Sequence, residues 1–275
     1  MDNQAEPRIL LATDNTALSY FKITSAVPST KLLLFLHCGG GHINESYMRM
    51  AAGLNQLGIM CYLMDLRGHG LSGGKRGDTP DKEQVFNDLQ NMLALMQQEH
   101  PELPLLLAGH SISAGLILNF LSQSELRLNI SELYFIAPNF GRYSNTYRIY
   151  RQDLFVKSVN WCKLWAYRWS NHHYYKNDYV INLRVNKQMK AKDPLLIDRY
   201  TNEMVEALTP KMPVACLTQL DIPFNVLVGG KDILFSMKSL QRFCHQSTKL
   251  KHFIIVPEAN HFSIIKEVAQ LFQPS

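Results

Sequence analysis

The stretch Leu105–Gly115, LLLAGHSISAG, is the part of this sequence that decides its fold. Leu105–Ala108 is an apolar run typical of a buried strand, and an apolar pattern of helical spacing follows directly after Ser113. Between them stands Ser111, with Gly109 and Ser113 as small residues two positions to either side. A strand, a tight turn and a helix with a serine at the apex form the context of a nucleophile elbow. Because the motif is short, its interpretation depends on the rest of the chain.

Apolar strand-like segments alternate with amphipathic helical segments on both sides of this stretch. The alternation predicts an α/β fold with a mostly parallel central sheet of about eight strands and helices on both faces. An antiparallel hairpin is expected at the start, from Ile9–Thr13 and Leu18–Ile23. The other expected strands are Lys31–His37, Ile59–Leu66, Leu133–Ala137, Phe224–Val228 and Phe253–Val256, and the expected helices include Tyr47–Leu57, Asp81–Glu99, Met237–Cys244 and Ile264–Phe272.

A compositional shift marks a separate substructure between two of these strands. About eighty residues separate Leu133–Ala137 from Phe224–Val228, which is far more than one crossover needs. Within them, residues 141–215 hold 13 Lys and Arg against 6 Asp and Glu, a net charge of +7, with all 3 tryptophans and 8 of the 12 tyrosines. We therefore predict a core at 1–140 and 216–275, interrupted by an inserted lid at 141–215.

Composition excludes several classes of protein. The hydrophobic content of 46% supports a large packed domain, and no apolar run reaches the roughly 18 residues of a transmembrane helix. The first residues do not resemble a secretory signal, so a cytoplasmic location is expected. Five scattered cysteines without a C-x-x-C pair argue against disulfides and a metal site. The basic charge has no nucleic-acid-binding motif beside it, so no nucleic acid partner is expected.

A serine at this position requires a base and an acid. Histidine is the usual base, and a carboxylate fixes its tautomer. Asp232 follows the strand Phe224–Val228, and His261 follows the strand Phe253–Val256, so both should lie at the sheet edge that carries Ser111. The chain order of serine, aspartate and histidine fits this architecture. Glu258, on the loop of His261, is the competing acid.

An oxyanion intermediate also needs two backbone N–H donors. One is expected from Ile112, the residue after the serine, and the other from Gly39 in the glycine run after Lys31–His37. The run is not a phosphate loop, since it lacks G-x-x-x-x-G-K-[ST]. Asp65, which ends another strand, is expected to hold the loop that follows it. The pair His172-His173 lacks metal-motif spacing and is interpreted as surface.

Several motifs together resemble the α/β-hydrolases of the monoacylglycerol lipase and lysophospholipase group. The resemblance implies the α/β-hydrolase fold, a serine hydrolase with Ser111, Asp232 and His261, and oxyanion donors at Gly39 and Ile112. It also implies a helical lid between the sixth and seventh strands, and no cofactor. The motifs are Leu36-His37-Cys38-Gly39-Gly40, DLRGHGLSGGKRG at Asp65–Gly77, Gly109-His110-Ser111, Gly230-Lys231-Asp232 and Asn260-His261.

Two positions depart from that pattern. Cys38 follows His37 where the family usually has glycine, and a positive φ at that position would strain a cysteine. Ser113 stands where the family usually has glycine, two residues after the serine. Neither change removes a catalytic group.

Aromatic and basic residues gather in the predicted lid. Trp161, Trp165 and Trp169 recur every four residues, so on a helix they form one stripe. One interpretation packs the stripe on the core, a second places it against substrate, and a third brings it, with the surrounding cations, to an anionic membrane surface. These interpretations remain open at the level of sequence.

The sequence thus predicts a serine hydrolase that cleaves a carboxylic ester of an acyl lipid, such as a monoacylglycerol or lysophospholipid, through an acyl-enzyme. One alternative is an esterase, thioesterase or peptidase acting on a small soluble acyl compound. A second alternative is a non-catalytic binding protein on the same fold.

Overall fold

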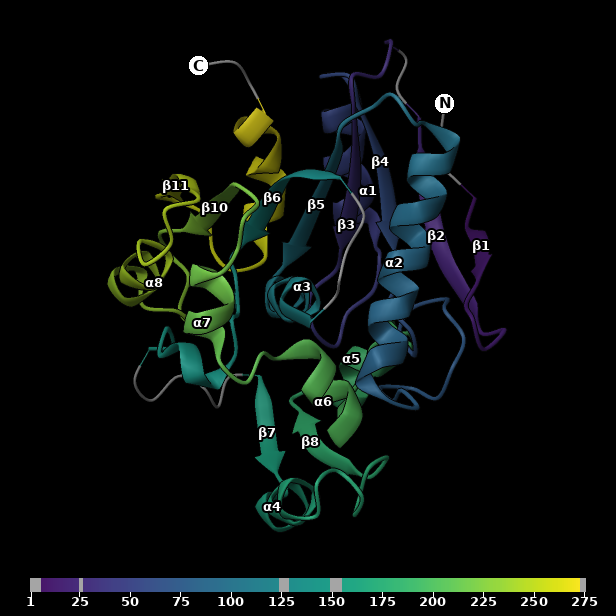
Figure 1. Ribbon diagram of the computed structural model, residues 1–275, viewed down its shortest axis with the longest axis vertical. Coiled ribbons are helices and arrows are strands. Elements are labelled where there is room, and N and C mark those ends of the chain that lie inside the picture. Colours follow the sequence, from purple (N-terminus) through teal and green to yellow (C-terminus); the bar gives the residue numbers. More distant parts are fainter. Residues whose placement is uncertain (1–5, 25–26, 124–128, 149–154, 273–275) are drawn as a thin grey trace.

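A twisted sheet of eight strands forms the centre of the computed structural model, which describes residues 6–24, 27–123, 129–148 and 155–272 (Figure 1). The strand order is β1-β2-β4-β3-β5-β6-β10-β11. The first two strands are antiparallel to their neighbours, and the remaining pairs are parallel. The bounds are β1 Arg8–Leu11, β2 Ala17–Ile23, β3 Lys31–Leu36, β4 Ile59–Met64, β5 Leu105–His110, β6 Ile130–Ile136, β10 Phe224–Gly229 and β11 Leu250–Val256.

Helices cover both faces of this sheet because its central strands are apolar on both sides. Along β3, Leu32 and Leu34 pack into one hydrophobic cluster while Leu33 and Phe35 pack into another, as the two-residue strand period requires. The first cluster includes side chains of α2 Lys82–Glu99, α3 Ile112–Gln123 and α8 Met237–Cys244. The second includes those of α1 Glu45–Asn55 and the 3-10 helix η3 Ser263–Phe272.

Most elements lie where the sequence predicts them. The helix expected at Met237–Cys244 has those bounds, and Asp81 caps the N-terminus of α2 through Gln84 N. The helix expected at Ile264–Phe272 is instead a 3-10 helix. Periodicity indicated an apolar helical face there, but it does not distinguish an α-helix from the tighter 3-10 form.

The insertion, residues 137–223 between β6 and β10, forms the lower part of the molecule in Figure 1. It lies between the sixth and seventh strands of the main sheet, as expected, but it is not purely helical. The strands β7 Val156–Val159, β8 Tyr179–Leu183 and β9 Arg199–Thr201 form a small antiparallel sheet. Its remaining elements are η1 Arg142–Ser144, α4 Trp161–Trp169, α5 Lys187–Lys192, α6 Asn202–Leu208 and α7 Pro213–Thr218.

Two short strands of the insertion, β7 and β9, are not predicted from the sequence, for a physical reason. β7, with the sequence VKSV, and β9, with three residues, are too short for an alternating pattern to stand out. Their pairing is decided by contacts between segments far apart in the chain. The end of the insertion joins the core, since α6 and α7 pack against α3.

The loop after β4 is organised around the buried carboxylate of Asp65, as the sequence predicts. One oxygen accepts the N–H of Ile43 at 2.7 Å and the other accepts the N–H of Leu71 at 2.8 Å. Gly70 has φ +47°, and a Cβ there would lie 2.1 Å from the Asp65 carboxylate. Only glycine therefore lets the loop close around this side chain.

Gly70→Ala should lower the free energy of unfolding by about 3 kcal/mol, because the new methyl group collides with Asp65 and the backbone is left-handed. The matched control is Gly53→Ala in α1, where the nearest atom to the new Cβ is 4.0 Å away. That variant should gain up to about 1 kcal/mol of stability from helix propensity. Urea denaturation of both variants measures the difference, and equal effects would contradict the packing argument.

Candidate active site

Ser111 lies at the sharp junction between β5 and α3, with a backbone φ of 57°. This left-handed conformation is uncommon for a residue with a side chain. The surrounding backbone holds it: its N–H donates to Ile136 O at 2.9 Å, and its carbonyl accepts the N–H groups of Ala114 and Asn139. A Cβ at Gly109 would lie 2.7 Å from the backbone of Ser113, so the turn requires glycine there.

Ser111, His261 and Asp232 form a continuous chain of hydrogen bonds. His261 Nε2 lies 2.9 Å from Ser111 Oγ, and His261 Nδ1 lies 2.7 Å from Asp232 Oδ2. Asp232 Oδ1 accepts the N–H of Leu234, and all three members of the chain are buried. With Nδ1–H donated to the carboxylate, Nε2 is the nitrogen that can accept the proton of the serine.

The competing acid, Glu258, lies elsewhere. Its side chain is 82% exposed and forms an ion pair with Lys231. Within the described part of the chain, no hydrogen bond or ion pair joins it to His261, whereas the side chain of Asp232 is completely buried beside that ring. The carboxylate positioned to hold the histidine is therefore Asp232.

In the loop after β3, one backbone N–H group lacks a hydrogen-bond acceptor among the described residues. The N–H of Cys38 donates to Tyr47 Oη at 3.0 Å, the N–H of Gly40 to Tyr200 Oη at 2.6 Å, and the N–H of Gly41 to Cys38 O. Among the described residues, the N–H of Gly39 has no acceptor. This amide belongs to the position that the sequence predicts as an oxyanion donor.

Ile112, the second predicted donor, lies next to Gly39. A Cβ on Gly39 would lie 3.0 Å from Ile112 Cγ2, so the side chain of Ile112 packs directly against Gly39. The N–H of Ile112 begins α3 and has no acceptor among the described residues. The positive end of the α3 dipole adds to the attraction for a negative oxygen.

The two departures from the family pattern are accommodated without strain. The left-handed residue of the glycine run is Gly40, at φ 71°, and Cys38 has no positive φ. Ser113 Oγ donates to His37 O, so its hydroxyl ties the elbow helix to the neighbouring loop. Sequence analysis could not locate the left-handed position within three consecutive glycines.

Two tyrosines that sequence analysis missed fix this loop. Tyr47 Oη donates to His110 Nδ1, while His110 Nε2–H donates to the carbonyl of His261. Tyr200, from β9 of the insertion, donates in the same way to His69 Nε2 at 2.9 Å. Burial lowers the pKa of His110 and of His69 to about 3, so both rings stay neutral. No local pattern identifies either tyrosine, since each acts across a long sequence separation.

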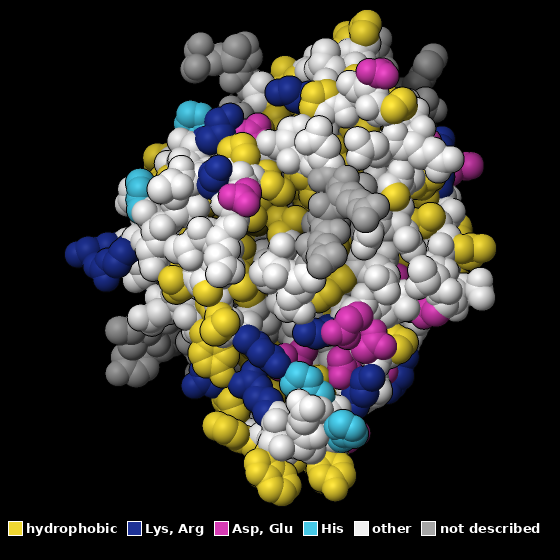
Figure 2. Space-filling view, in the orientation of Figure 1, with side chains coloured by type: hydrophobic (Ala, Val, Ile, Leu, Met, Phe, Trp, Pro, Cys, Tyr) yellow, Lys and Arg dark blue, Asp and Glu magenta, His cyan; other side chains and the backbone are white. Residues whose placement is uncertain are grey.

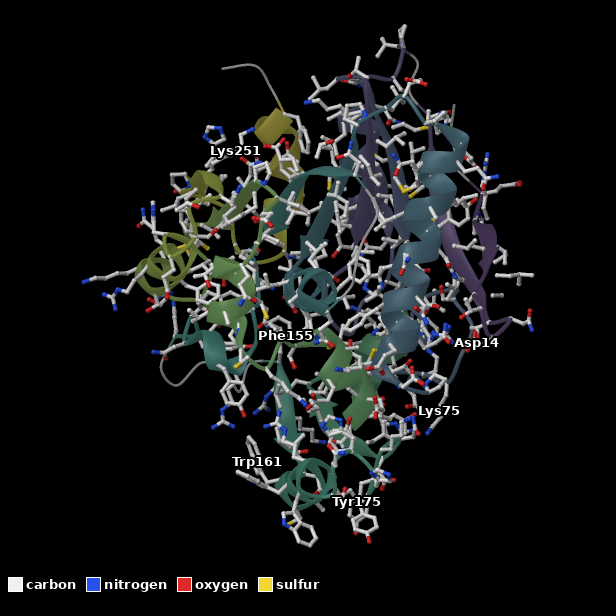
Figure 3. The ribbon with its side chains drawn as sticks, viewed as in Figure 1. Asp14, Lys75, Phe155, Trp161, Tyr175 and Lys251 are labelled. Atoms are coloured by element: carbon white, nitrogen blue, oxygen red, sulfur yellow. The ribbon has the colours of Figure 1, made fainter. Side chains whose placement is uncertain are left out.

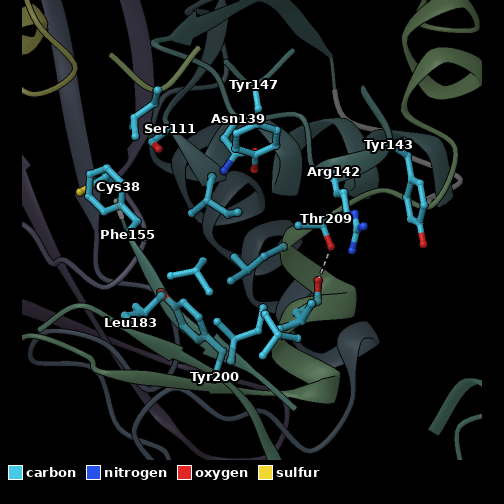
Figure 4. Close-up of a pocket in the computed structure, with 18 of the residues that line it drawn as sticks. Cys38, Ser111, Asn139, Arg142, Tyr143, Tyr147, Phe155, Leu183, Tyr200 and Thr209 are labelled. Carbon is cyan, nitrogen blue, oxygen red and sulfur yellow. Dashed lines mark hydrogen bonds between the residues drawn. The ribbon is translucent and has the colours of Figure 1, made fainter. Parts of the chain in front are cut away.

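A cavity of about 450 Å³ opens beside Ser111 and His261, between the core and the insertion (Figure 4). Of the three tryptophans, Trp161 alone lines it. The prediction that Trp165 and Trp169 also contact substrate is not supported, since they lie outside the lining and are 68% and 87% exposed. From α4, the side chains of Trp161, Leu164 and Arg168 reach the cavity. Its apolar lining includes Ile112, Phe155, Val156, Val159, Leu164, Ile181, Leu183, Val205, Leu208, Leu234, Phe235 and Phe262.

The described part of the chain has neither a cluster of metal-ligating side chains nor a membrane-spanning helix. Its residues contain no group of three or more His, Cys, Asp or Glu side chains arranged to hold a metal ion. No helix within the described ranges combines the length and apolar character needed to cross a bilayer.

Comparison with known protein families matches residues 28–268 to the family described as serine aminopeptidase, S33. The chain belongs to this family. The match spans both halves of the core and the insertion between them. The predicted resemblance to monoacylglycerol lipase-like α/β-hydrolases is confirmed, as is the α/β-hydrolase fold.

The sequence relatives match this S33-family chain only in part. It is 34% identical over 71 residues to a monoacylglycerol lipase of Mycolicibacterium smegmatis, covering 26% of this chain and 25% of that protein. It is 31% identical over 108 residues to the monoglyceride lipase of Rattus norvegicus, covering 39% and 35%. The matches thus span about a quarter to a third of the length of these relatives.

Solved structures extend the likeness of this S33-family chain over its whole length. A soluble variant of monoglyceride lipase from Saccharomyces cerevisiae, in complex with a substrate analogue, superimposes with a TM-score of 0.77. The superposition covers 99% of this chain and 95% of the other at 16% identity. At that identity the likeness concerns the fold alone.

The buried histidines make the stability of this family member depend on pH. Unfolded histidine binds a proton below about pH 6.5, whereas His110 in the fold does so only near pH 3. Stability is therefore lost as the pH falls through this window. Between pH 7 and pH 5 the free energy of unfolding should fall by up to about 2 kcal/mol less in His110→Gln than in the wild-type chain. Denaturant titration at both pH values measures it, with exposed His252→Gln as the control that should retain the wild-type dependence.

Proposed function

We propose that this chain is a serine hydrolase that cleaves a carboxylic ester of an acyl lipid. The observation that carries the proposal is the contact chain from Ser111 Oγ through His261 to Asp232 at one end of a largely apolar cavity. Membership of the S33 family supports the reaction class, and the monoglyceride lipases among its relatives support the substrate class.

In the proposed reaction, Ser111 Oγ attacks the acyl carbonyl carbon while His261 Nε2 takes the hydroxyl proton. Asp232 holds the ring and stabilises the imidazolium that forms. The tetrahedral intermediate collapses when His261 returns the proton to the leaving alcohol, which leaves the acyl group on Ser111. Water then attacks with its proton passing to His261, and the carboxylic acid departs as Ser111 recovers its hydrogen.

The negative oxygen of each tetrahedral intermediate would accept from the N–H groups of Gly39 and Ile112. Two preorganised amides in a buried site stabilise such an oxygen strongly, and loss of one donor from such a site typically costs about 100-fold or more in rate. The hydroxyls of Tyr47 and Tyr200 support this arrangement, because they engage the amides on either side of Gly39.

Ser111→Ala should reduce hydrolysis of a p-nitrophenyl acyl ester by at least about 10⁴-fold and abolish labelling by a fluorophosphonate probe. The matched control is Ser122→Ala, an exposed serine at the end of α3 whose hydroxyl donates to Asn119 O. That variant should keep both properties. Undiminished hydrolysis in Ser111→Ala would contradict the assignment.

The same assay separates the remaining alternatives. A folded wild-type chain that reacts with no fluorophosphonate would favour a binding protein. A preference for short soluble esters, with no rate increase on micelles, would favour an esterase, thioesterase or peptidase. An acyl lipid hydrolase should instead gain rate with chain length, because each added methylene contributes about 0.8 kcal/mol when buried.

We also propose that the tip of the insertion contacts an anionic lipid surface. Trp165 and Trp169 project from α4 into solvent, and Tyr174 and Tyr175 are exposed in the following turn. Figure 3 labels Trp161 and Tyr175 at this extremity. Figure 2 displays hydrophobic side chains there, with Lys and Arg side chains above them. Interfacial aromatics flanked by cations are typical of peripheral membrane contact.

The double variant Trp165→Ala/Trp169→Ala should bind phosphatidylserine-containing vesicles at least about tenfold more weakly, because it loses two interfacial aromatics. The matched control is Ile9→Ala/Leu11→Ala, which removes two exposed apolar side chains from β1, at a distant edge of the sheet (Figure 1). Vesicle sedimentation measures both. Equal binding by the two double variants would refute the contact.

A further inference from the structure

The lining of the cavity has an unbalanced charge. Four cationic side chains, Arg142, Lys157, Arg168 and Lys211, contribute to it, and none of the described aspartates or glutamates does. The nearest compensating group is Glu206, whose buried carboxylate pairs with both Arg168 and Lys211. One carboxylate therefore serves two of the four cations.

The other two cations have no carboxylate partner among the described residues. Arg142 stacks on Trp161, with its guanidinium 4.8 Å from the ring centroid, and this contact leaves its N–H groups available. Arg168 also has unmet hydrogen-bonding capacity, because its buried Nε has no acceptor in the part of the chain that the structure describes. Around Arg142 and Arg168, the side-chain N–H donors thus outnumber the hydrogen-bond acceptors that the described residues supply.

The part of the lining around Arg142, which we call the cationic wall, lies at the end of the cavity away from the nucleophile. Figure 4 shows Ser111 and Cys38 on one side, and Arg142 and Tyr143 on the opposite side. The two ends are nevertheless close along the backbone. Asn139 N donates to Ser111 O, and Arg142 follows three residues later, within about 10 Å of Asn139. Ser111 and Arg142 line the same cavity, so one substrate molecule can place its ester at Ser111 and an anionic group at Arg142.

From this arrangement we propose that the preferred substrate carries a negatively charged group, of the phosphate type, on its alcohol portion. The inference rests on the proposed ester hydrolase function and specifies its substrate class. Arg142 binds the anion, for which a planar guanidinium offers paired donors. Arg168, which donates to the neighbouring Tyr143, and Lys211, which shares Glu206 with Arg168, add positive potential beside it. The acyl chain lies against the apolar side chains of the cavity.

Short-chain esters separate this subsite from any lipid surface, because they react as dissolved monomers. The probes are 1-hexanoylglycerol and 1-hexanoylglycerol 3-phosphate, and the readout is the ratio of their kcat/KM values. The wild-type chain should favour the phosphate ester by about fivefold or more. Arg142→Gln should bring the ratio near one, Arg142→Lys should recover part of it, and Lys187→Ala, which removes a cation from α5 outside the cavity, should leave it unchanged.

A wild-type ratio near or below one, or a preference that survives in Arg142→Gln, would overturn the subsite while leaving ester hydrolysis intact. Calorimetric binding of hexyl phosphate to the wild-type chain and to Arg142→Gln tests it independently of turnover. Binding that depends on Arg142 without hydrolysis of either ester would retain the subsite and overturn the proposed function. No difference in hexyl phosphate binding would count against the subsite.

Discussion

The left-handed backbone of Ser111 is the constraint on which the rest of the site depends. A residue with a side chain adopts φ 57° only when its surroundings fix it there, and here three backbone hydrogen bonds and the absence of a side chain at Gly109 do so. The conformation turns Oγ out of the sheet edge. It also begins α3 at Ile112, so the hydroxyl and a free N–H arise from the same turn.

Hydrogen bonds from buried polar groups hold the neighbouring loops against this turn. Tyr47 and Tyr200 accept the amides on either side of Gly39, and each hydroxyl then donates to a neutral histidine. The carboxylate of Asp65 similarly accepts two amides around the adjacent loop. Because buried donors are paired with acceptors, the exceptions at Gly39 and Ile112 stand out as sites for a ligand oxygen.

The insertion is both a cover and a structural part of the site. Tyr200 of β9 reaches the glycine run, and Ile197 N donates to Gly40 O, so the insertion fixes the loop it covers. Its other end presents aromatic side chains to solvent, while its inner wall is apolar with a cationic margin. One segment thereby links the geometry of the elbow, the shape of the cavity and the exposed surface.

The sequence by itself determined the parallel core, the elbow at Ser111 and the order of Asp232 and His261, since these follow from local patterns and from the rule that parallel strands end at one edge. It also located the insertion and the amide of Gly39. Tertiary structure alone decided the three-stranded sheet, the roles of Tyr47 and Tyr200, the exposure of Trp165 and Trp169, and the cationic wall around Arg142. Each of these depends on contacts between segments distant in the chain, which no local periodicity encodes.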